Sequence, residues 1–213
     1  MGENIVISNK AERFWDRTAH IYDRVEKRDA QTYSKTIEKT RKYLKVKDIV
    51  LDFGCGTGLV SNEIADNVKM VYAIDISSKM IEIAREKAVR KNIQNIEYVR
   101  TTIFDARFSQ DSIDVILVFN ILHLLEDPQK VIQRITELLK PGGIIISATP
   151  CMGEKPLYNS LLSIGSKIGI TPEIISFTTN ELDNLFVKGN FELIEAGNLK
   201  NNSPEYLLIA KKL

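Results

Sequence analysis

The sequence predicts an α/β protein with a doubly wound, mostly parallel seven-stranded sheet and helices on both faces. Three observations support this prediction. Apolar segments of strand length alternate with amphipathic helical segments between residues 46 and 149. The first strand runs into a glycine-rich turn that opens a helix. The last two apolar segments are joined by a loop too short for a crossover helix, so they are expected to pair as an antiparallel hairpin.

Two amphipathic helices are expected ahead of the first strand, after a loose terminus at residues 1–9. Apolar side chains recur at spacings of three and four from Lys10 to Lys27, and again from Asp29 to Leu44. We expect these helices, within residues 1–45, to form a lid that covers a sheet edge or a ligand pocket. Tyr22 lies on the apolar face of the first helix, as either a core residue or a pocket residue.

Residues 46–149 form the expected core of the fold. Its expected strands are Asp48–Phe53, Met70–Asp75, Ile96–Thr102, Ile113–Asn120 and Ile144–Thr149. Its expected helices are Leu59–Asn67, Ser78–Lys91 and Pro128–Lys140. Asp127 is placed to cap the last of these helices, and Pro141-Gly142-Gly143 is expected to stop it.

Residues 150–177 interrupt the alternation of strands and helices. Apolar residues there suggest a helix in an insertion over the carboxyl edge of the sheet: Leu157, Leu161, Leu162 and Ile168. Residues 178–213 are expected to supply a helix, opened by a capping box at Thr178 and Glu181, and the closing hairpin of Phe191–Ala196 and Glu205–Lys211. We therefore expect a single domain over residues 1–213.

Composition narrows the functional classes. The chain has 213 residues, 44% of them hydrophobic, which suits one well-buried domain. Its formal net charge of +1 removes the strongest argument for nucleic acid as the main partner, although the first 48 residues carry twelve Lys or Arg against eight Asp or Glu. The two cysteines, Cys55 and Cys151, form neither a disulfide framework nor a metal cluster, and no apolar run approaches membrane-spanning length. These features predict a cytoplasmic protein without a metal and without membrane insertion.

The turn after the first strand carries the clearest chemical signal. Its spacing, Gly54-x-Gly56-x-Gly58, differs from the G-x-G-x-x-G fingerprint of dinucleotide sites. Asp52 stands two residues before the first glycine, and a carboxylate there suits a cationic ligand better than a phosphate. Taken alone, the same residues also fit an ordinary tight turn between a strand and a helix.

A second acid ends the next expected strand. Asp75 lies seventeen residues beyond Gly58, and in a strand–helix–strand unit this places its carboxylate beside the glycine turn. There it can accept hydrogen bonds from ribose hydroxyls. The two acids together indicate a pocket for a nucleoside-bearing ligand.

These features, in this order, resemble the class I S-adenosylmethionine-dependent methyltransferases of the small single-domain kind. The resemblance covers almost the whole chain. The segments that carry it are Val50–Gly58, Asp75, Leu138–Gly143, Phe119–His123 and Phe14–Tyr22.

The resemblance implies S-adenosylmethionine as the cofactor and a set of residues that bind it. The glycines would let the backbone lie against the cofactor, Asp52 would anchor its ammonium group, and Asp75 would hold its ribose. Asn120 would stand near the sulfonium. Thr102 occupies a position where the family often has an acid for adenine. The full expected set is Tyr22, Asp52, Gly54, Cys55, Gly56, Gly58, Asp75, Ile76, Thr102, Ile103 and Asn120.

Methyl transfer from a sulfonium depends chiefly on an aligned nucleophile, and a general base is needed only if the acceptor must lose a proton. His123 is the candidate base, and it equally fits a residue that packs the start of the next loop. Cys55 is expected to be a small packed side chain. Pro150-Cys151 matches the residue pair of covalent cytosine methylases, but it follows the fifth strand rather than the fourth and has no evident activating base.

The sequence thus predicts a methyltransferase that acts on a small-molecule acceptor. Two alternatives remain at this point. The acceptor could be a protein or RNA, which the basic N-terminal helices would support, or the chain could be a non-catalytic cofactor-binding module. A nicotinamide-dependent oxidoreductase is disfavoured by the glycine spacing and the closing hairpin. The sequence does not specify the accepting atom or the oligomeric state.

Overall fold

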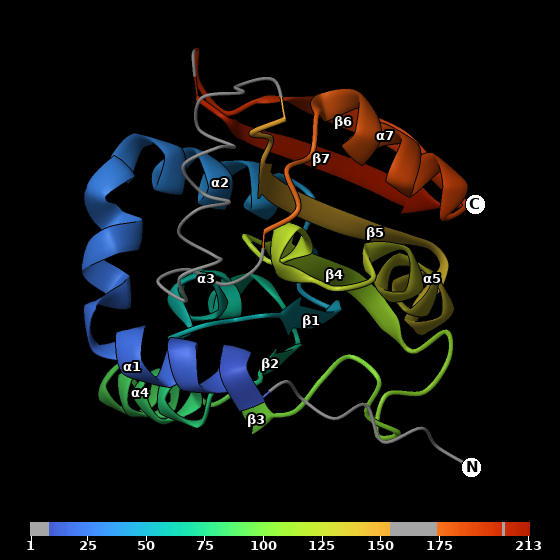
Figure 1. The fold of residues 1–213 in the computed structure, drawn as a ribbon. Helices are drawn as coiled ribbons and strands as arrows, with labels where there is room; N and C mark the ends of the chain where they lie inside the picture. The colour runs from blue at the N-terminus through green and yellow to red at the C-terminus, as the bar shows by residue number, and fades with distance from the viewer. Residues whose placement is uncertain (1–8, 154–173, 202) are drawn as a thin grey trace.

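The computed structural model describes residues 9–153, 174–201 and 203–213. These residues form one seven-stranded sheet in the order β3-β2-β1-β4-β5-β7-β6, flanked by helices (Figure 1). The strands are β1 (Ile49–Phe53), β2 (Met70–Asp75), β3 (Ile96–Arg100), β4 (Ile113–Phe119), β5 (Leu139–Pro150), β6 (Phe191–Asn198) and β7 (Glu205–Lys212). Strands β3, β2, β1, β4 and β5 pair in parallel, whereas β7 is antiparallel to both β5 and β6. The predicted fold class and its closing hairpin are confirmed.

Four of the described helices start after a residue whose side chain caps them. The described helices are α1 (Asn9–Glu26), α2 (Ala30–Lys42), α3 (Leu59–Ile64), α4 (Ser78–Arg90), α5 (Pro128–Leu138) and α7 (Thr179–Lys188). The Asp29, Ser77 and Asp127 side chains accept backbone N–H bonds at the starts of α2, α4 and α5. The predicted capping box of Thr178 and Glu181 opens α7. None of the described helices is both long and apolar enough to cross a membrane.

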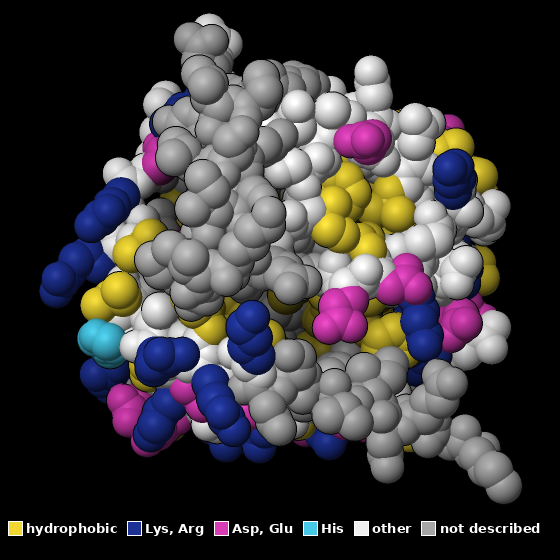
Figure 2. Space-filling view, viewed as in Figure 1, with side chains coloured by type: hydrophobic (Ala, Val, Ile, Leu, Met, Phe, Trp, Pro, Cys, Tyr) yellow, Lys and Arg dark blue, Asp and Glu magenta, His cyan; other side chains and the backbone are white. Residues whose placement is uncertain are grey.

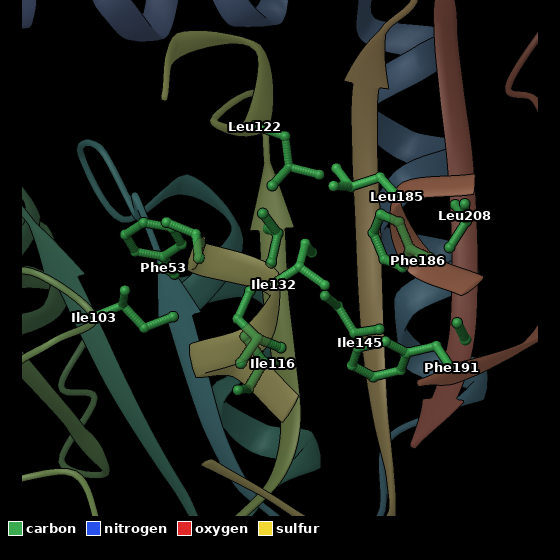
Figure 3. Close-up of a cluster of buried hydrophobic side chains, with 14 of the residues drawn as sticks. Phe53, Ile103, Ile116, Leu122, Ile132, Ile145, Leu185, Phe186, Phe191 and Leu208 are labelled. Carbon is green, nitrogen blue, oxygen red and sulfur yellow. The ribbon is translucent and has the colours of Figure 1, made fainter. Parts of the chain in front are cut away.

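The two faces of the sheet are covered by separate groups of buried apolar side chains. Successive residues of a strand point to opposite faces, so Leu51 of β1 belongs to one group and Val50 to the other. The first group packs against α5 and α7, where Ile132 and Phe186 lie close to Ile145 of β5 (Figure 3). The second group packs against α3 and α4. Helices on both faces make the sheet doubly wound, as predicted.

Strand β5 differs most from its prediction. It begins at Leu139, five residues before the predicted Ile144, and α5 ends at Leu138 rather than at Lys140. Leu139 pairs with Ile113, and the register then shifts before the pairing of Val115 with Ile144. The expected helix stop at residues 141–143 is therefore a bulge inside the strand. The Lys140 ammonium fastens this bulge to the Asp114 carboxylate of β4, with 2.7 Å between the nitrogen and oxygen atoms.

The other described boundaries fall within two residues of their predicted positions, apart from the end of α3. That α-helix was expected to reach Asn67 but ends at Ile64, because residues 65–67 tighten into a 3-10 turn. Most of the expected insertion at 150–177, including the helix predicted from Leu157 to Ile168, lies outside the described residues.

Candidate active site

The turn between β1 and α3 has glycine at every second position. Gly54, Gly56 and Gly58 have φ angles of +75°, +53° and +72°, a region that is costly for residues with a Cβ atom. A Cβ atom at Gly54 would also stand 2.8 Å from the Cδ1 atom of Ile121, and one at Gly58 would collide with the hydroxyl of Tyr98. Both backbone conformation and space therefore require glycine in this turn.

Asp52, near the end of β1, lies directly before the glycine turn. Only 2% of the residue is exposed, and its carboxylate accepts a hydrogen bond of 2.5 Å from the Ser61 hydroxyl of α3. Burial raises the pKa of Asp52 to about 6, and the negative charge of Asp75 adds to the effect. This carboxyl group can therefore gain stability from a positively charged ligand.

Asp75, at the end of β2, is joined to the same turn. Its carboxylate accepts hydrogen bonds from the backbone N–H groups of Gly56, at 3.0 Å, and Ser77, at 2.8 Å. Burial raises the pKa of Asp75 to about 6, against the opposing effect of these bonds. The prediction that this acid lies beside the glycine turn is confirmed. Each carboxylate oxygen keeps a lone pair for a further hydrogen bond.

A cavity of about 650 Å³ lies between the N-terminal helices and the carboxyl ends of β1, β4 and β5. Six of the predicted site residues line it: Tyr22, Asp52, Gly54, Cys55, Asn120 and His123. The other six do not: Gly56, Gly58, Asp75, Ile76, Thr102 and Ile103. The predicted residues thus divide between the cavity and the neighbouring loops after β2 and β3.

Tyr22 and Cys55 meet at the glycine turn from different elements. A Cβ atom at Gly56 would lie 3.1 Å from the Cε1 atom of Tyr22, so the tyrosine ring of α1 lies over the turn. Burial, together with nearby Glu26, raises the pKa of Tyr22 well above its ordinary value. Burial also raises the pKa of the Cys55 thiol, so this residue is a packed neutral side chain and not a nucleophile.

Three further predicted cofactor residues, of which Thr102 and Ile103 are the two expected at adenine, lie on the loops after β2 and β3. Ile76 directly follows Asp75, and its carbonyl accepts a bond from Arg100 at 3.2 Å. The Thr102 hydroxyl accepts a bond from the backbone N–H of Phe104 at 3.3 Å. The side chain of Ile103 is only 1% exposed and packs with the core on the α5 face. A ligand could therefore reach Ile103 only through its backbone.

Asn120 and His123 follow β4 at the floor of the cavity. Asn120 has a positive φ of 54°, and its backbone N–H donates to the carbonyl of Ala148 at 2.9 Å. Burial lowers the pKa of His123 to about 4. The Nδ1 atom of His123 is buried and has no hydrogen-bond partner among the described residues. The imidazole is therefore neutral at physiological pH, and His123 lines the cavity although its Nδ1 atom is itself buried.

Three acidic residues of the cavity, Glu26, Asp29 and Glu205, are not among the residues predicted from the sequence. Glu26 lies four residues after Tyr22, so helical spacing puts both side chains on one face of α1, and this signal was available. Glu205 begins β7 and pairs with Pro150 at the end of β5. Because β7 is antiparallel, its first residue lies at the edge where the parallel strands end, and only the assembled sheet shows this.

The glycine turn and the two acids beside it indicate the kind of ligand that this class of protein binds. A glycine turn follows the first strand, one buried acid precedes it, and a second acid from the next strand contacts it through Gly56. This arrangement fits a nucleoside-bearing cofactor with a positive charge better than a pyrophosphate.

Comparison with known proteins identifies the family. The family model described as "Methyltransferase domain" matches residues 44–190. The chain therefore belongs to the methyltransferase-domain family, as a class I, Rossmann-like and S-adenosylmethionine-dependent member.

Individual relatives agree with this assignment. The ubiquinone biosynthesis O-methyltransferase of Vibrio atlanticus is 30% identical over 138 residues, which are 64% of this chain and 57% of that protein. The chain spans about half the length of the curated relatives it matches. A S-adenosylmethionine-dependent methyltransferase of Methanosarcina mazei matches with a TM-score of 0.66 and 25% identity, over 81% of this chain and 95% of that one. A methyltransferase of Haloferax volcanii, solved in complex with the activator Trm112, matches in fold with a TM-score of 0.76 and 17% identity, over 92% of this chain and 96% of that one.

Proposed function

We propose that this chain transfers a methyl group from S-adenosylmethionine to a small-molecule acceptor bound beneath α1 and α2. One observation carries the proposal: a single cavity of about 650 Å³ is lined both by Asp52 and Gly54 of the glycine-turn site and by apolar side chains of the lid helices. Its volume suits a small organic molecule. The O-methyltransferases of ubiquinone biosynthesis among the relatives favour an acceptor of this size and an oxygen nucleophile.

In this proposal the acids and glycines of the turn hold the cofactor. Asp52 pairs with its ammonium group, because a buried carboxylate gains most from a cation. Asp75 accepts hydrogen bonds from the ribose hydroxyls through the oxygens that already bind Gly56 and Ser77. The backbone of the three glycines and Cys55 lies against the cofactor, and Tyr22 covers it from α1.

The adenine end is assigned to the loops after β2 and β3. Ile76 would supply an apolar surface next to Asp75, and Thr102 a hydroxyl for a hydrogen bond. Ile103 would act through its backbone, since its side chain is buried in the core. Because Thr102 carries no charge, we expect a weaker hold on the adenine amino group than an acid would give.

S-adenosylmethionine supplies a methyl group on a positively charged sulfur. The residues of the cavity would hold the acceptor atom in line with the sulfur–methyl bond of the cofactor. The new bond to the methyl group would form as this bond breaks, and the electron pair of the broken bond would stay on sulfur. Apolar side chains of the cavity, such as Phe119 and Leu124, exclude water from this path. We assign Asn120 to the reacting end because it follows β4 on the cavity floor.

His123 remains the candidate base for an acceptor that must lose a proton. With a pKa of about 4 the imidazole is a weak base, but it is neutral at physiological pH and can take part in a hydrogen bond. We therefore assign it to the acceptor hydroxyl, which it would orient before the proton leaves.

The divisions of the chain follow the same proposal. Residues 1–45 would act as a lid, residues 46–149 as the cofactor-binding core, and residues 178–213 as the closing unit. The segment 150–177 would shape the acceptor pocket, since Pro150 and Ile174, its described ends, both line the cavity.

Charge pairing on the second helix favours a small acceptor over RNA. Lys39, Arg41 and Lys42 of α2 are each paired with a glutamate. On the face shown in Figure 2, Lys and Arg side chains are interspersed with Asp and Glu. Such pairing leaves less uncompensated positive charge for a phosphate backbone than the sequence count alone suggests.

The test is a methyl-transfer assay that measures S-adenosylhomocysteine. The chain is incubated with S-adenosylmethionine and, separately, with low-molecular-weight, protein and RNA fractions of a bacterial extract. We expect product only with the low-molecular-weight fraction. Product only with protein or RNA would contradict the proposal, and cofactor binding without transfer to any fraction would indicate a non-catalytic module.

A further inference from the structure

Three acidic side chains of the acceptor cavity have no part in the proposed methyl transfer, and one of them, Asp29, is paired with Lys200. Glu26 is the last residue of α1, and Glu205 is the first residue of β7. Both line the cavity that Asp52 and Gly54 reach from the glycine turn. The fold thus brings two carboxyl groups into one largely apolar chamber, although they lie far apart in the sequence.

The carboxyl group of Glu26 is held by Asn120, the residue that follows β4. The side-chain amide of Asn120 donates a hydrogen bond to its carboxylate, with 3.3 Å between the nitrogen and oxygen atoms. Burial raises the pKa of Glu26 despite this bond. Asn120, which we assign to the reacting end of the cavity, therefore also orients the Glu26 carboxyl group.

The carboxyl group of Glu205 has no hydrogen bond comparable to the one between Asn120 and Glu26. No hydrogen bond or ion pair to its carboxyl group is found within the described residues, although burial and the charges of Glu26 and Asp29 raise its pKa to about 7. Glu205 is half-buried, and a carboxyl group that has lost part of its hydration gains from a partner. Its position at a cavity wall means that a ligand can provide the missing partner.

No ion pair joins Glu26 or Glu205 to a Lys or Arg among the described residues. Arg28 is the one Lys or Arg among the described lining residues, and it is exposed. Asp29, the third acid near this end, is already paired with Lys200. Among the described lining residues, Glu26 and Glu205 are therefore two acids without a paired cation.

Glu205 is also distant from the expected ammonium site of the cofactor. In the sheet order, β7 is three positions away from β1, which carries Asp52. Neighbouring strands lie about 4.8 Å apart, so the two residues are separated by roughly 14 Å across the sheet. The cation that Glu205 lacks is therefore not the ammonium group held by Asp52.

We propose that Glu26 and Glu205 bind a protonated amine of the acceptor, so that the acceptor is a small amine with an apolar body. This inference rests on the proposed function. An ammonium group can compensate both carboxylates and donates three hydrogen bonds, whereas a neutral hydroxyl leaves two neighbouring like charges without a counter-charge. Ile21, Val25 and Phe119 line the same cavity and would contact the apolar body.

The test compares amines with neutral molecules of the same shape. The full chain, saturated with S-adenosylhomocysteine, is titrated by calorimetry with 2-phenylethylamine, tyramine, dopamine and hexylamine, and with the alcohol that replaces each amine. We expect at least one amine to bind about tenfold or more tightly than its alcohol, equivalent to about 1.4 kcal/mol. Equal binding within every pair, or no binding by any amine, overturns the proposal.

Glutamine variants test the assigned residues. Glu205→Gln and Glu26→Gln keep the shape of the side chains and should abolish the amine preference, while alcohol binding changes little. Glu86→Gln, which removes the same charge from an exposed position of α4, should keep the preference. Retention of the preference in both cavity variants contradicts the assignment, provided that thermal melting shows they are folded.

The cofactor titration separates this inference from the proposed function. If the unmodified chain fails to bind S-adenosylmethionine, the proposed function fails. If it binds the cofactor but shows no amine preference, the inference alone fails. Glu205→Gln should leave the affinity for S-adenosylmethionine within about twofold of the unmodified chain, because its carboxyl group lies on the acceptor side.

Discussion

At the scale of single residues, the two acids at the glycine turn determine how the site responds to pH. Burial raises the pKa of Asp52 and of Asp75 to about 6, so both are partly protonated in mildly acidic solution. In the ligand-free protein, a raised pKa contributes stability below the ordinary value of about 3.9, and this contribution is lost as pH rises through 6. A cation binds the ionised form, so ligand affinity changes in the opposite direction.

We therefore expect the affinity for S-adenosylmethionine to rise from pH 5 to pH 7 and to level above that range. Each proton displaced on binding contributes about a tenfold change per pH unit below the pKa. Asp52→Asn should weaken binding at pH 7.5 and flatten the profile by about one proton. Calorimetry at several pH values measures both effects.

The exposed residue Asp66 provides the control, because Asp66→Asn removes a carboxylate without touching the cavity. Its profile should match that of the unmodified chain. If the Asp52→Asn profile also matches, Asp52 is not the group that titrates on binding, and its assignment to the ammonium group is wrong.

At the scale of elements, α1 is fastened to the core at three places along its length. Glu12 pairs with Arg100, the last residue of β3, at 2.6 Å. Asp16 accepts bonds from the start of α4, including one of 2.6 Å from the Ser77 hydroxyl. Asp23 contacts both Thr57 and Lys87. Since Thr57 stands inside the glycine turn, the third contact joins the lid helix directly to the proposed cofactor site.

We expect Asp23→Asn to weaken S-adenosylmethionine binding by about threefold to tenfold, because it loosens Tyr22 over the glycine turn, while stability falls by less than about 1 kcal/mol. Hydrogen exchange should increase in the last turn of α1. The control Glu82→Gln breaks the exposed pair with Lys79 on α4 and should change neither quantity. Unchanged cofactor affinity in Asp23→Asn would show that this contact does not support the site.

The boundary between α5 and β5 was predicted wrongly from the sequence, and the error has a physical cause. The helix stop expected at Pro141-Gly142-Gly143 depended on local preferences for turns, yet Leu139 already pairs with Ile113 of β4. Pairing with a neighbouring strand overrides those preferences, and the proline and glycines become a bulge. By contrast, the capping box at Thr178 is a local interaction, and it appears where predicted.

At the scale of the whole molecule, the topology places the polar residues of the candidate site at one edge of the sheet. Asp52, Asp75 and Asn120 end or follow parallel strands, so their sequence positions were enough to place them at that edge. Glu205 reaches the same edge only because β7 is antiparallel, and Glu26 reaches it only because α1 packs over the turn. The residues that we propose for the cofactor could therefore be predicted from local motifs, whereas those that we propose for the acceptor depend on how distant segments pack.

The central claim is that this edge binds S-adenosylmethionine, and calorimetric titration of the purified chain tests it most directly. We expect S-adenosylmethionine and S-adenosylhomocysteine to bind at one site per chain, with dissociation constants of about 1–100 μM, and nicotinamide adenine dinucleotide to give no binding heat. Binding of the dinucleotide without binding of S-adenosylmethionine would contradict the account, because the glycine turn would then hold a pyrophosphate and not a cationic cofactor.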